Sequence, residues 1–335
     1  MPSLAVAQAL SARGVSVSFA GSPERIEARL VPEAGYGLDT FRISGLPRRP
    51  GAAQLRAVLL AGGAPRACAR ILAVRQPDVV FGGGGYVAGP MVYAAWHKRI
   101  PAALAEADAH FGLANRMAAP FARRVFLAYP VAGRVGAKYR VVGRPVPARG
   151  RLLREEARRR FELPVDGPVL LVFGGSQGAA ALNEITLSEF AAAGPAVLHL
   201  CGERYLAGLA GRVSRPDYRL LAWTDDFGAA LDASDLVLAR AGGSVWEVAA
   251  AGKAAVLVPS PNVTADHQTK NARHFERVGG AVVVPEPEIS RVPEIVFGLL
   301  ADEARLARMG AAMQRAAKPD AADEIAEELI SLASA

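Results

Sequence analysis

Two apolar segments of this chain run directly into glycine-rich turns, and this repeated feature constrains the fold most. The first is Pro77-Asp-Val-Val-Phe81 followed by Gly82-Gly-Gly-Gly85; the second is Pro168-Val-Leu-Leu-Val-Phe173 followed by Gly174-Gly-Ser-Gln-Gly178. A strand that is apolar throughout is typical of a parallel sheet with both faces covered, and parallel strands need crossover helices. Each half of the chain is therefore predicted to be a doubly wound α/β domain.

The hydrophobic pattern repeats this alternation of strands and helices along the 335 residues. A chain of this length is expected to form two domains. Helices are expected at 54–73, 90–98 and 151–161, and in a long C-terminal region, 293–332, with a break at Pro319. Strands are expected at 15–19, 39–44, 77–81, 101–104, 139–142, 168–173, 196–200, 218–222, 236–238, 255–258 and 281–284.

The segment Arg144–Gly150 has the composition of a linker, with two prolines, a glycine and no apolar period. It suggests an N-terminal domain over 1–146 and a C-terminal domain over 147–315. The remaining helix, 316–335, is expected to pack back on the N-terminal domain. The predicted architecture is two Rossmann-like domains that face each other across a cleft.

The turn after the second apolar strand, residues 173–183, has the chemistry of an anion site. Glycines allow backbone N–H groups to approach an oxyanion, and the following helix adds a positive partial charge. Gly175, Ser176 and Gln177 are the candidate contacts to a phosphate. The spacing matches neither GxGxxG nor a P-loop, and a plain tight turn between strand and helix is the alternative.

A second stretch, residues 238–252, repeats the pattern with Gly242, Gly243 and Ser244 before a helix that carries Glu247. A carboxylate at this place suits the paired hydroxyls of a ribose. The alternative is a glutamate that only stabilises the first turn of its helix. Two such turns in one half favour a nucleoside diphosphate as ligand.

Two further loops follow strands and are expected to hold substrate. In 259–275 the candidates are Gln268 and Asn271, whereas His267 and His274 lack a partner at metal-ligand spacing. In 81–90, Gly83 and Gly84 lie at the end of a strand, where ligands bind in open α/β sheets.

These stretches together resemble one family, the peptidoglycan glycosyltransferases that move N-acetylglucosamine from UDP onto lipid I to form lipid II. The family has the two-Rossmann-domain (GT-B) fold. The resemblance covers essentially the whole chain, and its motifs occur in order: SLAVAQAL, Arg42-Ile-Ser-Gly45, PDVV with GGYVAGP, Gly112-Leu-Ala-Asn115-Arg116, GRPVP, GGSQGAAALN, Trp223-Thr-Asp-Asp226, RAGGSVWE and DHQTKNA.

The resemblance implies roles for particular residues. Ser176 and Ser244 would lie beside the UDP phosphates, and the backbone of Thr224 would read the uracil. Glu247 would bind the ribose and Gln268 the sugar hydroxyls. The 82–85 turn would face the diphosphate of the acceptor. The remaining residues that the resemblance places at the substrates are Gly175, Gln177, Gly242, Gly243, Val245, Trp246, Gly83, Gly84, Asn115, Asp108 and Arg144.

The chain departs from the family pattern at several positions. The family often has His-Glu-Gln-Asn where this chain has Ala105-Glu106-Ala107-Asp108, so an asparagine that contacts the sugar is an aspartate here. Pro147 replaces an arginine, for which Arg144 or Arg149 would substitute. The RAGGSVWE loop is one residue shorter than the common form. Tolerated variation within a subgroup is the favoured interpretation.

A further departure concerns the first helix, which begins at Pro2 and feeds a strand. In the family, a strand and a Gly-rich loop that ends in histidine precede this helix. That histidine is the family's candidate base, so no catalytic residue is assigned here. The chain is expected to bind UDP and to be nearly inactive, with Met1 doubtful as the natural start.

Three readings of the function remain open at this point. The first is the glycosyltransferase itself, and the second is a UDP-binding protein without catalysis. The third is another enzyme of the same architecture, such as a UDP-N-acetylglucosamine epimerase or another lipid glycosyltransferase. An epimerase would need carboxylates in the cleft, where Glu106 and Asp108 are the obvious candidates.

The net charge of +7 comes without a basic tract interleaved with aromatic residues, so no nucleic acid partner is expected. An anionic membrane surface or a phosphate-bearing substrate fits the charge. The segment 55–60 with Arg66 and Arg70 would form the membrane patch, although a core helix is an equal alternative. No metal and no cofactor are expected. The protein is predicted at the cytoplasmic face of the membrane.

Overall fold

The computed structural model describes residues 2–43, 52–147, 150–175 and 177–334, and for 52–61 only the backbone. The chain divides into two compact units: unit 1 is Met1–Pro147 with Pro319–Ala335, and unit 2 is Ala148–Lys318. Helices and parallel strands alternate in both units. The predicted fold class, α/β with two Rossmann-like domains, is confirmed.

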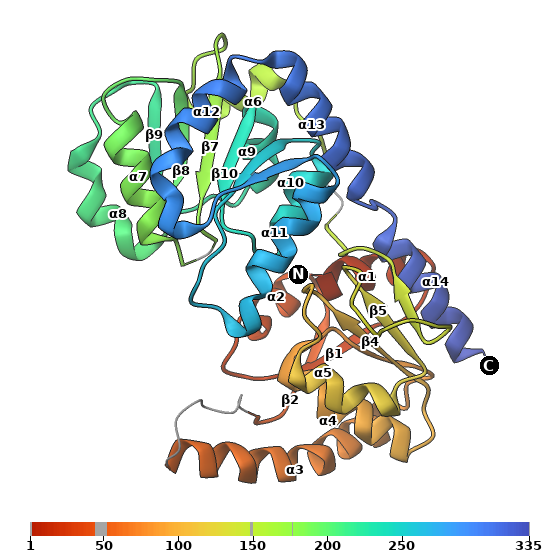
Figure 1. Cartoon of the computed structure of the whole chain (residues 1–335). Coiled ribbons are helices and arrows are strands. Elements are labelled where there is room, and N and C mark those ends of the chain that lie inside the picture. The colour runs from red at the N-terminus through yellow and green to blue at the C-terminus, as the bar shows by residue number, and fades with distance from the viewer. Residues whose placement is uncertain (1, 44–51, 148–149, 176, 335) are drawn as a thin grey trace. The chain divides into compact units, whose positions relative to one another are not determined.

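Unit 1 begins with a helix and ends with the last helix of the chain (Figure 1). In chain order its elements are α1 (Pro2–Ala12), β1 (Ser18–Gly21), α2 (Glu27–Glu33), β2 (Gly37–Thr40), α3 (Ala52–Arg75), β3 (Val80–Gly82), α4 (Gly85–His97), β4 (Ala102–Glu106), α5 (Leu113–Ala118), the 3-10 helix η1 (Ala119–Phe121), β5 (Arg124–Leu127), β6 (Tyr139–Val141) and α14 (Ala321–Ala333).

The described strands of unit 1 form two parallel sheets. One contains β1 and β2, and the other contains β3, β4, β5 and β6 in that order. Phe81 of β3 lies opposite Ala103 of β4, and Leu104 lies opposite Val125 of β5. Because these strands are parallel, the turns that follow β3 and β4 leave the same edge of the sheet.

Helix α14 covers one face of the larger sheet together with α1, as Figure 1 shows in blue and red. Its Glu328 carboxylate accepts hydrogen bonds from Arg124 at 2.5 Å and from Arg140 at 2.6 Å, which fixes the helix to β5 and β6. The cluster between these elements contains Val6, Leu10, Ala103, Phe126, Val142, Ile325, Ala326, Leu329 and Leu332.

The opposite face of this sheet holds a second apolar cluster. Leu104 and Val125 point into it, whereas their neighbours Ala103 and Phe126 point toward α14, as alternation along a strand requires. Helices α3 and α4 cover this second face.

Unit 2 contains six strands among its described residues, with helices between them (Figure 1). Its elements are α6 (Arg154–Arg160), β7 (Val169–Phe173), α7 (Ala180–Phe190), β8 (Ala196–Leu200), α8 (Glu203–Leu209), η2 (Ala210–Arg212), β9 (Tyr218–Leu221), α9 (Phe227–Ala233), β10 (Leu236–Ala239), α10 (Val245–Ala250), β11 (Ala254–Leu257), η3 (Thr264–Asp266), α11 (His267–Arg277), β12 (Ala281–Val283), η4 (Glu286–Arg291), α12 (Val292–Leu300) and α13 (Glu303–Ala316).

The sheet of unit 2 is parallel, with the strand order β12-β11-β10-β7-β8-β9. From β7 the chain moves outward through β8 and β9, and it then returns to β10 on the other side of β7. The boundary between β7 and β10 is therefore the topological switch point, where ligands bind in open α/β sheets.

One buried cation ties α6 to this sheet. The guanidinium of Arg158 has no exposed surface, and it donates to Ala233 O at 3.1 Å, to Gly167 O at 2.9 Å and to the Asp235 carboxylate at 2.7 Å. Burial lowers the pKa of Arg158. The Asp235 carboxylate also accepts from Val169 N at 2.8 Å, so the pair connects α6 to the start of β7.

The strands predicted in the second half are confirmed, and 196–200 coincides with β8. The strand predicted at 15–19 was misplaced, because β1 begins at Ser18. Val15 and Val17 instead pack against the cluster under α1 and α14. The alternation of apolar and polar residues at 15–19 is thus caused by this packing and not by a strand in a sheet.

Two predicted helices are longer than expected. α3 extends two residues beyond 54–73 at each end, and it runs through Gly62, Gly63 and Pro65 because Ala64, Cys68 and Leu72 lie on one buried face and hold the helix by packing. α4 begins at Gly85 instead of Pro90, so the glycine-rich turn leads directly into this helix.

Candidate functional site

The two glycine-rich turns of unit 2 begin side by side at the switch point. Phe173 at the end of β7 lies opposite Ala239 at the end of β10, and Arg240 N donates to Phe173 O at 3.4 Å. Both turns contain predicted phosphate contacts, and the sheet brings them to one edge between two neighbouring strands.

The turn after β7 can be made only by glycine at its last position. Gly178 has φ of +67°, and a Cβ atom there would lie 2.0 Å from Cys201 O. Gly175 and Gln177 are exposed on this turn, whereas Ser176 lies outside the described residues. Among the described residues no side chain caps α7, so its first N–H groups point toward the turn as potential donors to an anion.

The turn after β10 is less exposed than the turn after β7. Gly242, Gly243 and Ser244 are partly exposed, as is Glu247 in the first turn of α10. The side chains of Val245 and Trp246 are buried in the core of unit 2, at 0% and 1% exposure. A ligand at this turn would therefore meet the backbone of these two residues.

Two polar residues hold this turn in place, and this role was not predicted from the sequence for either of them. Arg240 donates to Val258 O at 3.1 Å and to Pro259 O at 3.2 Å, and it pairs with Glu286. Asn271 was expected to contact substrate, but it is completely buried and donates to Ala241 O at 3.2 Å. The only sequence signal for Arg240 is a charged residue directly after an apolar strand, and no sequence signal marks the role of Asn271.

Thr224 lies in the loop after β9 and Gln268 in the first turn of α11, both at the carboxyl edge of the sheet. Thr224 follows β9, and its hydroxyl accepts from Asp226 N at 3.2 Å. The Gln268 side-chain oxygen accepts from Ser260 N at 2.9 Å, which leaves its Nε2 as the donor that a ligand would meet. The first bond fixes the loop predicted to read the uracil, and the second joins α11, which carries the residue predicted to bind the sugar, to the loop after β11.

In unit 1 the glycine-rich turn after β3 also leads into a helix. Gly84 has φ of +99° and precedes α4, and a Cβ atom there would lie 3.1 Å from Ala105 O of β4. A Cβ atom on Gly83 would lie 2.0 Å from Ser3 Oγ of α1. The turn is thus packed closely between the first helix and the neighbouring strand.

The loop after β4 closes around a buried carboxylate. Glu106 is 7% exposed and accepts from Gly112 N at 2.9 Å, from Asn115 Nδ2 at 2.9 Å and from Asp108 N at 3.3 Å. Asn115, also buried, donates to Ala105 O as well. Glu106, one of the two carboxylates named for an epimerase, thus has both of its oxygens bonded within this loop.

The other predicted residues of unit 1 remain partly exposed. Asp108 lies in the loop that Glu106 organises, and Arg144 follows β6. In the described part of the chain, no three His, Cys, Asp or Glu side chains converge in a way that would hold a metal ion.

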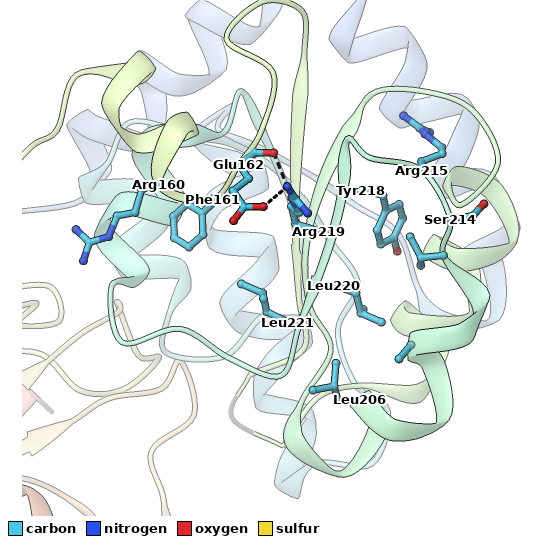
Figure 2. Close-up of a pocket in the computed structure, with 12 residues that line it drawn as sticks. Arg160, Phe161, Glu162, Leu206, Ser214, Arg215, Tyr218, Arg219, Leu220 and Leu221 are labelled. Atoms are coloured by element: carbon cyan, nitrogen blue, oxygen red, sulfur yellow. Dashed lines mark hydrogen bonds and ion pairs between the residues drawn. The ribbon is translucent and has the colours of Figure 1, made fainter.

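A cavity of about 530 Å³ lies away from both turns, along the outer strand β9 (Figure 2). Arg219 crosses it to donate to Glu162 O at 3.1 Å and to pair with the Glu162 carboxylate. Arg215 on its wall is likewise paired, with Asp217. None of the predicted site residues lines this cavity.

Comparison with protein families gives matches to both halves of the chain. Residues 1–127 match the glycosyltransferase family 28 N-terminal domain, and residues 169–325 match the glycosyltransferase family 28 C-terminal domain. Together these two matches cover most of the chain.

Similar individual proteins agree with these family matches. A UDP-N-acetylglucosamine–N-acetylmuramyl-(pentapeptide) pyrophosphoryl-undecaprenol N-acetylglucosamine transferase of Salinibacter ruber is 40% identical over 99% of this chain and 93% of its own length. The crystal structure of Acinetobacter baumannii MurG has a TM-score of 0.78 at 26% identity and covers 98% of this chain and 95% of that one. A UDP-GlcNAc 2-epimerase from Neisseria meningitidis, with a TM-score of 0.68 at 14% identity over 98% of this chain and 95% of that one, shares the fold alone.

Proposed function

This chain belongs to glycosyltransferase family 28, and from that membership we propose that it transfers N-acetylglucosamine from UDP-N-acetylglucosamine to the muramyl sugar of lipid I, forming lipid II. The observation that carries the proposal is the pair of glycine-rich turns at the switch point of unit 2, a place that suits a nucleoside diphosphate.

The donor would lie along the carboxyl edge of the unit 2 sheet. The diphosphate would accept hydrogen bonds from the 174–178 turn, from the start of α7 and from the turn at Gly242–Ser244. The uracil would meet the backbone of Thr224, the ribose hydroxyls the Glu247 carboxylate, and the sugar hydroxyls the Gln268 amide. Charge on the leaving UDP would thus meet fixed N–H donors, which stabilise a developing anion strongly.

The acceptor would bind unit 1 at the turn after β3. The N–H groups at the start of α4 and around Gly83 and Gly84 suit the acceptor diphosphate. Asn115 and Glu106 hold the neighbouring loop, from which Asp108 is presented, and Arg144 adds a cation. In the proposed inverting step the muramyl hydroxyl attacks the anomeric carbon from the face opposite the leaving UDP, and the carbon–oxygen bond to UDP breaks.

Transfer of radiolabelled N-acetylglucosamine from its UDP donor to a lipid I analogue tests the proposal directly. We expect a lipid-linked disaccharide product, formed slowly because no catalytic base is assigned in the chain. For Glu247→Gln we expect kcat/KM at least about tenfold lower, since the proposed ribose contact loses its charge. Glu303→Gln, an exposed change at the start of α13, is the matched control.

Two outcomes would contradict the proposal. UDP binding without any transfer would indicate a non-catalytic homologue, and conversion of the donor to its C2 epimer would indicate an epimerase. The buried, fully engaged Glu106 argues against the second outcome.

We also propose that unit 1 binds an anionic membrane surface, where lipid I would be found. In the described part of the chain no helix is long and apolar enough to cross a bilayer. Instead, aromatic side chains of α4 and η1 form an exposed cluster, in which Trp96 is 51% and Tyr93 38% exposed. The centroids of both rings lie within 5.1 Å of the centroid of the Phe121 ring. Exposed Leu113 and Met117 of the adjoining α5 extend this apolar surface.

Cations suited to anionic lipid also occur in unit 1. Arg66 and Arg70 are exposed one helical turn apart on α3, opposite the buried Cys68. The apolar segment 55–60, predicted to accompany them, lies outside the described side chains. Aromatic rings at an interface beside such cations are typical of peripheral binding.

Flotation with vesicles of phosphatidylglycerol and phosphatidylcholine tests the membrane proposal. We expect retention at low salt that falls with added salt, and several-fold weaker retention of Trp96→Ser. Trp223→Ser, which removes an exposed tryptophan of unit 2, serves as control. Equal retention of both variants would contradict the assignment of this surface.

A further inference from the structure

A buried chain of polar side chains lies beneath the 174–178 turn and has no part in the proposed substrate contacts. It runs from β9 through β8 to α7: Tyr218 Oη lies 2.7 Å from His199 Nδ1, and His199 Nε2 lies 3.0 Å from Asn183 Oδ1. Asn183 Nδ2 then donates to Cys201 O at 3.0 Å. All three side chains are at most 3% exposed.

The chemistry of the groups fixes the direction of every bond in this chain. A carbonyl can only accept, so the Asn183 amide nitrogen faces Cys201 O and its oxygen faces His199. Nε2 of His199 must then carry the proton. Because burial lowers the pKa of His199 to about 3, the ring is neutral, and its Nδ1 accepts from the Tyr218 hydroxyl.

The backbone at the end of this chain supports two loops of the proposed donor site. A Cβ atom on Gly178 would lie 2.0 Å from Cys201 O, and one on Gly202 would lie 2.7 Å from Gly178 Cα, so the turn after β7 rests directly on Cys201 and Gly202. On the other side, Gly202 N donates to Ala222 O at 2.9 Å, two residues before Thr224. Cys201–Gly202 therefore separates the turn assigned to the diphosphate from the loop assigned to the uracil.

We propose that Asn183 is a positioning residue for the nucleotide: held by His199 and Tyr218, it fixes Cys201–Gly202 and so sets the spacing between the diphosphate turn and the uracil loop. That the ligand is a nucleotide rests on the proposed function. Its contacts involve only unit 2, and Asn183 itself touches neither substrate. A fully satisfied buried polar chain is rigid, which suits a part that must hold a turn in one place.

Two substitutions separate this role from a contribution to folding alone. Asn183→Asp keeps an acceptor for His199 but replaces the donor to Cys201 O with a second oxygen, and Asn183→Ala removes both bonds. The matched control is Thr186→Val, one turn further along α7. Thr186 is equally buried, but its hydroxyl donates only within the helix, to Leu182 O at 2.7 Å.

Both Asn183 variants should raise the KM for UDP-N-acetylglucosamine and the Kd of UDP at least about tenfold, and leave the KM for the lipid I analogue within about twofold. A smaller folded fraction would lower the apparent kcat but not the donor KM. Thr186→Val should leave both KM values within about twofold. Unchanged donor KM and UDP Kd in the Asn183 variants would overturn the proposal.

Hydrogen exchange without any ligand distinguishes failure of this inference from failure of the proposed function. The amides of Gly175, of residues 177–179 and of Gly202 should exchange at least about tenfold faster in the Asn183 variants, with no such change in Thr186→Val. If the wild-type chain bound no UDP yet this acceleration appeared, the proposed function would be wrong, but the positioning of the turn by Asn183 would be supported. Wild-type exchange rates in both Asn183 variants would overturn the positioning.

Discussion

At the scale of single residues, several buried polar groups of unit 2, among them Arg158, Asn183 and Asn271, fix the backbone around the sheet by donating to its carbonyl groups. Arg158 is the largest of them, a cation without exposed surface whose donors meet backbone carbonyls and Asp235. Removing Arg158 would leave the carbonyls of Ala233 and Gly167 without this donor and would take the buried partner from Asp235, which is far more costly than the loss of an exposed ion pair.

Replacing Arg158 by methionine should therefore lower the free energy of unfolding of unit 2 by about 3–5 kcal/mol. Arg154 offers a matched control, because it pairs with the same Asp235 carboxylate but its side chain is 55% exposed. Arg154→Met should cost less than about 1 kcal/mol. Urea unfolding of the three proteins measures both values, and equal losses would contradict the role given to burial.

His199 predicts a pH dependence of stability. Burial lowers its pKa from 6.5 to about 3 in the folded chain, so the unfolded chain binds the proton first as the pH falls. The neutral folded form then loses stability between pH 6.5 and 3, by at most about 1.4 kcal/mol per pH unit. Between pH 7.5 and 5.5, wild type should lose about 1 kcal/mol more than His199→Gln in urea unfolding; parallel losses would show that His199 takes up its proton in the folded state.

Residue roles were the least predictable part of the site. A sequence can indicate that Asn271 and Glu106 follow strands, where ligands bind, but the same position is used to fold the loop itself. Both side chains are buried and bonded within the protein. Which of the two uses applies depends on how far each side chain turns inward, and this is set by packing between elements that are distant in sequence.

At the scale of elements, the strand–turn–helix units were predictable because their cause is local. A continuous apolar run followed by glycines allows few other structures, and β7 and β8 lie where that pattern places them. Helix starts were less predictable, as α4 shows, because a glycine-rich turn and the first turn of a helix look alike in sequence.

The turn after β7 gives a prediction at this scale. Gly178→Ala forces a side chain into φ of +67° and within 2.0 Å of Cys201 O, so we expect a loss of about 1–3 kcal/mol in stability and a donor KM at least about tenfold higher. Gly208→Ala, in α8 with no atom within 4 Å of the added Cβ, should be neutral or stabilise by up to about 1 kcal/mol. Steady-state kinetics with thermal unfolding measures both; an unchanged donor KM in Gly178→Ala would contradict the expectation.

At the scale of the whole molecule, the two units differ in how the chain builds them. Unit 2 is one continuous segment, whereas unit 1 needs α14 from the other end of the sequence. Ile325 and Leu329 of that helix are buried against α1 and the sheet, and Glu328 bonds to two arginines there. The proposed UDP contacts lie in unit 2 alone.

Separate expression of the units should reveal this difference. Residues 148–318 should unfold cooperatively and bind UDP with a Kd within about threefold of the whole chain. Residues 1–147 should be largely unfolded, since their sheet lacks the apolar cover of α14, and a peptide of residues 319–335 should restore folding. Calorimetry with and without the peptide is the measurement, and a 1–147 fragment that melts identically in both cases would contradict it.

The position of α14 also has a consequence for the protein as it is made. On the ribosome, β4, β5 and β6 emerge long before α14, and all of unit 2 is translated in the interval, which at 5–20 residues per second lasts on the order of ten seconds or more. During that time Phe126 and Val142 lack the cover of α14 and have only α1 on their face of the sheet, although they are nearly inaccessible in the finished protein. The nascent chain thus presents an apolar surface of the kind that chaperones bind until α14 is available to cover this sheet.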